Sequence, residues 1–274
     1  MNIMKINFKR IRNSVAVLMI VSLTACEEVI DLDLNSSNPV LVAEGVMDNE
    51  LAAWVKLSYT SDYFDAEPAI VEKNATVVVS DNEGNSETLE YISDGLYQGK
   101  DLLGSLDKQY TMTISTDEVE YDATSKLFPP SEIIDISFEE NSIKKPEEDE
   151  STYDITITFK DDIAVNNYYL IKYQSSGEVE EDASTYYLVD DDYYENTGVI
   201  EYSPFRLSFE LGDEVNIELY SVDEDTYIYY SQLNDEGGGM RGSSTPYTPK
   251  SNFGSDVLGY FVAWSMVEQT AIVE

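Results

Sequence analysis

Carboxylates are the most abundant groups in this sequence that could do chemistry. The chain has 54 Asp and Glu in 274 residues, including the runs Asp161-Asp162, Asp190-Asp191-Asp192 and Asp223-Glu224-Asp225. Calcium takes about six to eight oxygen ligands, so loops that are dense in carboxylates suit it. None of the runs has the central Gly and final Glu of an EF-hand loop. We keep Asp190, Asp191 and Asp192 as a candidate calcium site, with ordinary solvated loops as the alternative.

Tyrosines are the second group with binding chemistry, and the chain has 21 of them. Because adjacent residues of a strand face opposite sides, one member of a Tyr pair can be core and the other exposed. An exposed Tyr offers an apolar ring and a polar hydroxyl, which suits glycan or peptide ligands. The candidate ligand-binding residues beside the three aspartates are Tyr186, Tyr187, Tyr193 and Tyr194. The alternative is ordinary packing of tyrosines in a sheet.

The residue types argue against catalysis. Histidine is absent, which removes Ser-His-Asp and Cys-His mechanisms and the usual zinc sites. Paired carboxylates hydrolyse glycosides, but nothing in the sequence selects a pair. The glycine-rich run at 237–242 lacks the Gly-Lys-Ser/Thr of a phosphate loop, and we interpret it as a contact loop. We expect no enzyme activity and no cofactor apart from the candidate calcium.

The first 25 residues have the features of a secretory signal peptide. They carry four basic residues and no acid, and their apolar run, Ser14 to Leu23, is too short to cross a bilayer. The motif Leu23-Thr24-Ala25-Cys26 resembles the bacterial lipobox. That resemblance implies that Cys26 is lipidated on sulfur, becomes the mature N-terminus and anchors the protein in a membrane. The alternative is a chance buried cysteine behind an ordinary signal peptide.

The residues behind the cysteine form an acidic tether, predicted at 26–38. Its acidic start looks like the signal that sends some Gram-negative lipoproteins to the outer face of the outer membrane, so we expect the protein to face the cell exterior there. The alternative is a solvated acidic tether without an export role. Without residues 1–25 the chain keeps 12 Lys and Arg against 54 Asp and Glu, a formal charge of −42. Such a chain repels nucleic acid and anionic lipid surfaces, so neither is an expected partner.

The rest of the chain has the pattern of an all-β protein. Short segments of alternating apolar and polar residues, clearest at 153–159, are separated by turn signals every 8–12 residues, which favours β-sandwiches. Strands are expected at 39–46, 54–59, 75–80, 86–92, 96–97, 110–115, 118–124, 133–138, 153–159, 168–173, 186–189, 205–210, 215–220 and 260–265. The boundary signal Phe128-Pro129-Pro130 divides them into two tandem Ig-like sandwiches, at 39–128 and 129–274.

One short helix is expected in the second sandwich. Ser221-Val222-Asp223-Glu224 matches a capping box with Ser221 as the N-cap. Beyond it, Tyr227, Tyr230 and Leu233 recur at a spacing that places them on one helix face.

Taken in order, several segments resemble the uncharacterised lipoprotein family called "domain of unknown function 4249". They are Leu-Val-Ala-Glu-Gly (41–45), Val-Lys-Leu-Ser-Tyr-Thr (55–60), the stretch 75–84, Asp-Gly-Leu-Tyr (94–97), Asn-Tyr-Tyr (167–169) and the stretch 246–253. The resemblance implies two β-sandwich domains and a lipoprotein that works beside a TonB-dependent transporter, with no catalytic motif. The expected function is therefore a non-enzymatic accessory or substrate-capture subunit. The alternatives are a structural or adhesive surface lipoprotein and a carboxylate-dependent glycosidase.

Overall fold

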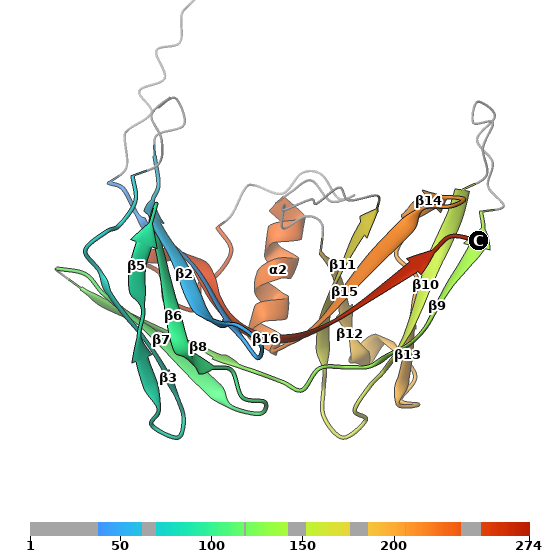
Figure 1. Cartoon of the computed structure of the whole chain (residues 1–274), viewed down its shortest axis with the longest axis horizontal. Coiled ribbons are helices and arrows are strands. Elements are labelled where there is room, and N and C mark those ends of the chain that lie inside the picture. The colour runs from blue at the N-terminus through green and yellow to red at the C-terminus, as the bar shows by residue number, and fades with distance from the viewer. Residues whose placement is uncertain are drawn as a thin grey trace, which may run out of the picture. The chain divides into compact units, whose positions relative to one another are not determined.

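The computed structural model describes residues 38–61, 70–117, 119–141, 152–175, 186–205, 207–236 and 248–274. The signal peptide, Cys26, the tether up to residue 37 and the glycine-rich run at 237–242 lie outside the described residues. Residues 38–274 form one compact unit, and its regular structure is almost entirely β-strand (Figure 1). Among the described helices, none combines the length and the apolar character needed to cross a membrane.

The described strands form three sheets. The strands are β1 (Leu41–Asp48), β2 (Ala52–Tyr59), β3 (Thr76–Asp81), β4 (Ser86–Thr88), β5 (Glu90–Ser93), β6 (Leu96–Leu103), β7 (Gln109–Ser115), β8 (Glu120–Lys126), β9 (Ile133–Glu140), β10 (Thr152–Lys160), β11 (Tyr168–Ser175), β12 (Tyr187–Asp190), β13 (Val199–Tyr202), β14 (Ser208–Glu210), β15 (Glu214–Val222) and β16 (Val257–Ile272). The largest sheet has the order β12-β11-β15-β16-β1-β2-β6-β5. The smaller sheets have the orders β4-β3-β7-β8 and β13-β10-β14, with β9 paired to β10.

The last strand, β16, belongs to both halves of the largest sheet. Its first part pairs in parallel with β1, and its second part pairs antiparallel with β15. Its 16 residues span about 50 Å, which is long enough to serve two packing units. Gly259 has a positive φ of 85°, and a Cβ there would lie 2.2 Å from the carbonyl oxygen of Ala43. Only glycine therefore permits this close approach of β16 to β1.

Each half of the largest sheet packs against one smaller sheet. The core of the first sandwich includes Val55, Val77 and Ile114, and the core of the second includes Ile157 and Leu219. In the part of the chain that the structure describes, the predicted all-β class is confirmed, with two sandwiches in tandem and one short α-helix. The first core also contains Phe253, Val257, Phe261 and Ala263, so it draws on both predicted ranges, 39–128 and 129–274.

The alternation predicted at 153–159 is confirmed by β10, which buries Ile155, Ile157 and Phe159. The single strand expected at 86–92 is wrong, because the chain changes sheets there. β4 pairs with β3 and β5 pairs with β6, while Leu89 between them is buried and donates its N–H to the carbonyl of Val77. β6 is also longer than expected, and β13 was not predicted at all.

Helix α2 (Glu224–Glu236) begins later than the capping box predicts. Ser221 is part of β15, where it pairs with Tyr169 and Ser265, so it cannot be the N-cap. The carboxylate of Asp223 replaces it and accepts the N–H of Thr226 at 2.8 Å. The expected helix face is confirmed in part, since Tyr227 packs on Tyr168 and Tyr230 packs on Tyr186.

Candidate functional site

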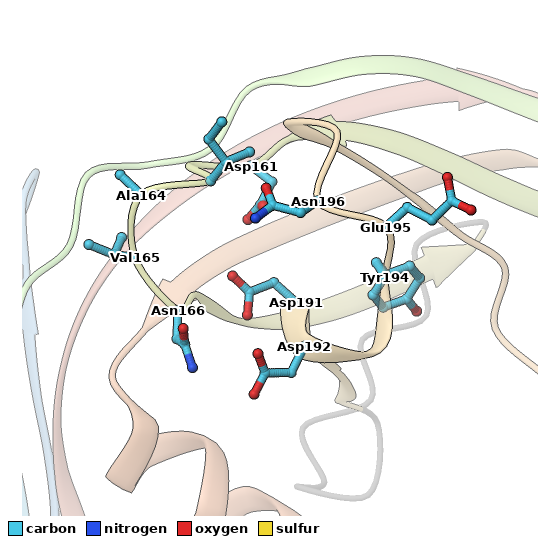
Figure 2. A pocket seen from close by; sticks show the side chains of 10 residues that line it. Asp161, Ala164, Val165, Asn166, Asp191, Asp192, Tyr194, Glu195 and Asn196 are labelled. Carbon is cyan, nitrogen blue, oxygen red and sulfur yellow. The ribbon is translucent and has the colours of Figure 1, made fainter.

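The described residues contain a small acidic cavity at one end of the second sandwich, here called the carboxylate pocket (Figure 2). It lies between the β10–β11 connection and the segment that follows β12, which includes the 3₁₀ turn η2 (Asp191–Tyr193). The volume is about 180 Å³. The lining residues are Asp161, Ile163, Ala164, Val165, Asn166, Asp191, Asp192, Tyr194, Glu195 and Asn196.

Reciprocal hydrogen bonds hold the two connections together. Asp191 donates its N–H to the carbonyl of Asn167 at 3.2 Å, and Asn167 returns its N–H to Asp191 Oδ2 at 2.9 Å. Asp161 donates its N–H to the carbonyl of Gly198 at 3.1 Å, and its Oδ1 accepts the hydroxyl of Tyr169 at 3.0 Å. The carboxylates are therefore positioned by backbone contacts between strand ends rather than by free loops.

The second carboxylate oxygen of Asp191 lies in an environment that is unfavourable for a negative charge. Asp191 Oδ1 is buried and has no hydrogen-bond partner among the described residues. Desolvation raises the pKa of Asp191, and the charges of Asp161, Asp192 and Asp190 add to this, while the Asn167 N–H opposes it. Protonation, or a cation bound beside it, would stabilise such a desolvated carboxylate.

The three predicted aspartates lie close enough together to contact one cation. Oxygens of Asp190, Asp191 and Asp192 all lie within 4.8 Å of one another, which one ion with oxygen ligands at about 2.4 Å can span. Asp190 Oδ1 also accepts the N–H of Asp192 at 3.0 Å, so that oxygen is already partly engaged. Asp161 and Asn196 line the same pocket as Asp191, and their side chains carry further oxygens (Figure 2).

Two of the four candidate tyrosines lie away from this pocket. Tyr186 packs edge-on against Tyr220 and Tyr230, and burial raises its pKa to about 12. Tyr187 packs edge-on against Tyr173 in the second core, on the opposite face of the sheet. Both rings contribute to packing, and their contact with a ligand stays a prediction.

Of the other two tyrosines, Tyr194 lines the pocket. Tyr193 belongs to the turn η2 beside it, is 81% exposed and is not part of the lining. Ile163 and Val165 stand on the opposite connection with 58% and 50% exposure. The three exposed side chains of Tyr193, Ile163 and Val165, here called the apolar rim, belong to the two segments that form the pocket. The sequence signalled Asp161 only as one acidic run among several, and it did not single out the apolar rim.

Fold and site together define an all-β protein of two sandwiches with an acidic pocket at one loop end. The chain belongs to the family of the domain of unknown function DUF4249, whose sequence profile matches residues 27–270. The family expected from the sequence is thereby confirmed.

Comparison with other proteins adds little beyond the family. No curated protein matches the chain. Among solved structures, it is similar to the FN1–FN3 domains of chicken CNTN1, with 12% identity and a TM-score of 0.22 over 69% of this chain. The chain spans 62% of the length of that structure.

Proposed function

We propose that the protein is a lipid-anchored, surface-exposed outer-membrane protein that acts as a non-enzymatic accessory or substrate-capture subunit of a TonB-dependent transporter. The anchor rests on the signal peptide and on Cys26 at the lipobox position. The role beside a transporter rests on what the family resemblance implies. The structural observation that supports a binding role is the carboxylate pocket with its apolar rim.

The pocket has the character of a contact surface. In this proposal the exposed side chains of Ile163 and Val165 supply apolar area that a partner buries, and the carboxylates of the pocket supply polar contacts. The two reciprocal hydrogen bonds between Asp191 and Asn167 form within the protein itself, without a partner. A partner therefore meets a surface that is already ordered and loses little conformational entropy there.

The tether limits how far this surface can lie from the membrane. Asn38 follows Cys26 by 12 residues, and a fully extended chain of that length reaches about 40 Å. In this proposal, the lipid at Cys26 keeps a strongly acidic body close to a membrane that would otherwise repel it. Cys26→Ser should release a folded protein into the soluble fraction, and a variant that stays bound after a salt wash would contradict the anchor.

Co-purification tests the partner. Tagged protein from detergent-solubilised outer membranes should recover a TonB-dependent transporter. A double variant, Asp191→Asn with Asp192→Asn, should recover less. The matched control is Asp135→Asn with Glu139→Gln, which removes the same charge from exposed positions on β9. Repeated recovery of no transporter would refute the proposal, and loss of cell aggregation with intact uptake in a deletion strain would favour the adhesive alternative.

A further inference from the structure

A second, larger groove lies in the first sandwich, away from the carboxylate pocket. It has a volume of about 550 Å³, within the range of about 300–1,000 Å³ that is usual for small-molecule sites. The lining residues come from five separate parts of the described chain: Asn38, Pro39, Val40, Leu41, Tyr59, Glu72, Asn74, Thr116, Asp117, Val119, Tyr121, Ser255 and Asp256. We call it the Glu72 groove.

Hydrogen bonds between its walls show that the Glu72 groove is preformed. Val40 and Thr60 exchange two hydrogen bonds, which join the first described residues to the end of β2. The turn between β7 and β8 is closed by Thr116 and Val119, whose backbone and side-chain groups bond to each other. The groove therefore does not depend on a ligand for its shape.

The carboxylate of Glu72 is held in one orientation. Its Oε2 accepts the hydroxyl of Tyr59 at 2.6 Å, and its Oε1 accepts the N–H of Asn74 at 2.7 Å. Desolvation raises the pKa of Glu72, but these hydrogen bonds outweigh it and the net pKa is lowered. Glu72 is therefore ionised at neutral pH. The segment around it is fastened to the core by Tyr97, whose hydroxyl bonds to the carbonyl of Glu72 and the N–H of Ala75.

The charges and rings of the lining indicate the chemistry of a ligand. Three carboxylates, Glu72, Asp117 and Asp256, face a groove whose described lining contains no Lys or Arg. The rings of Tyr59 and Tyr121 are half-buried against the first core and remain part of the groove wall. Carboxylates beside aromatic rings attract organic cations, through ion pairing and cation–π contact, and repel phosphates and carboxylates.

We propose that the Glu72 groove binds a ligand through an ammonium or guanidinium group that pairs with Glu72 and lies against the tyrosine rings. The site is separate from the carboxylate pocket, and it does not require the lipid anchor or the transporter. It gives the protein a means of capturing basic peptides or other organic cations.

The test uses the full chain purified in detergent and two blocked tripeptides, acetyl-Gly-Arg-Gly-amide and its citrulline counterpart. Citrulline keeps the shape of arginine but removes the charge. Binding is followed by NMR line shifts or calorimetry. The arginine peptide should bind about tenfold more tightly than the citrulline peptide, because hydrogen bonds to charged partners are the stronger ones.

Three variants locate the site. Glu72→Gln keeps an oxygen that accepts the Asn74 N–H and places its amide nitrogen beside the Tyr59 hydroxyl, to which it donates; it should remove the preference for arginine. Asp256→Asn, on an exposed loop of the same groove, should weaken it in part. Glu139→Gln removes one charge on β9 and should change nothing. The proposal is overturned by equal binding of both peptides, by absence of arginine-peptide binding, or by an equal effect of Glu72→Gln and Glu139→Gln. These outcomes leave the transporter role to its own test.

Discussion

Replacement of Asp223 by Ala should detach helix α2 from the first sandwich. The Asp223 carboxylate makes three hydrogen bonds. Its Oδ1 accepts the N–H of Thr226 at 2.8 Å, and its Oδ2 accepts the hydroxyl of Ser125 at 2.7 Å and the N–H of Lys126 at 2.9 Å. One side chain thus caps the helix and ties it to the end of β8.

The magnitude follows from these contacts. Loss of an N-cap costs about 1 kcal/mol. Each hydrogen bond to β8 contributes about 1 kcal/mol, the ordinary net value rather than the larger one of a buried charged acceptor, because Asp223 is only half-buried. The free energy of unfolding should therefore fall by about 3 kcal/mol. With a urea slope of about 3 kcal/mol per molar, the unfolding midpoint moves by about 1 M.

The assay is urea unfolding followed by far-UV circular dichroism and tryptophan fluorescence. The chain has two tryptophans, Trp54 and Trp264, and both pack in the clusters that α2 covers. Fluorescence therefore reports on the helix and its sheet. Asp225→Ala is the matched control, since this exposed first-turn acid contributes at most about 1 kcal/mol through the helix dipole. If the Asp223→Ala and Asp225→Ala midpoints coincide, the reasoning is refuted.

Two further predictions concern the β16 crossing and the carboxylate pocket. Gly259→Ala should lower the free energy of unfolding by about 2 kcal/mol or more, because residue 259 has a left-handed conformation and its new Cβ would meet the Ala43 carbonyl. The control is Gly212→Ala, where a Cβ meets nothing within 4 Å and the cost should be only about 1 kcal/mol. Equal unfolding midpoints for the two variants would contradict the close approach of β16 to β1. The raised pKa of Asp191 means that the folded state holds this proton more tightly than the unfolded state, so stability is lost as pH rises from the ordinary Asp value through the raised one. Asp191→Asn should flatten that loss in denaturation curves recorded at increasing pH from the ordinary Asp value of about 4 upward. Calcium at about 100 times its dissociation constant should stabilise the unaltered protein by about 2.7 kcal/mol but not Asp191→Asn, and a calcium effect that persists in this variant would exclude Asp191 as a ligand.

The local pattern of the sequence was sufficient for most of the strands. β10 is the clearest case, because Ile155, Ile157 and Phe159 alternate with polar residues and the structure buries all three. Such alternation depends only on neighbours along the chain and on which side faces water. The all-β class and the family were predictable for the same reason, since many such segments in a fixed order identify both.

The helix start shows where local pattern fails. Ser221 and Asp223 are both good N-cap residues by type, and the sequence favoured Ser221 because Glu224 follows at capping-box spacing. The sheet decides between them. Within β15, Ser221 pairs with Tyr169 of β11 on one side and with Ser265 of β16 on the other. Asp223 is therefore the first residue that is free to cap the helix.

The residue types available to the candidate site are evident from the sequence: abundant acids, paired tyrosines, no histidine and a cysteine at the lipobox position. Which of the acids meet depends on the pairing of the strands. Asp161 and Asp191 lie 30 residues apart, and they come together because β10 and β12 end at the same edge of the second sandwich. Likewise, β16 joins two sandwiches because its two halves find different partners, β1 and β15. Both arrangements depend on pairing between strands that are far apart in the sequence. The local alternation of apolar and polar residues does not specify which strands pair.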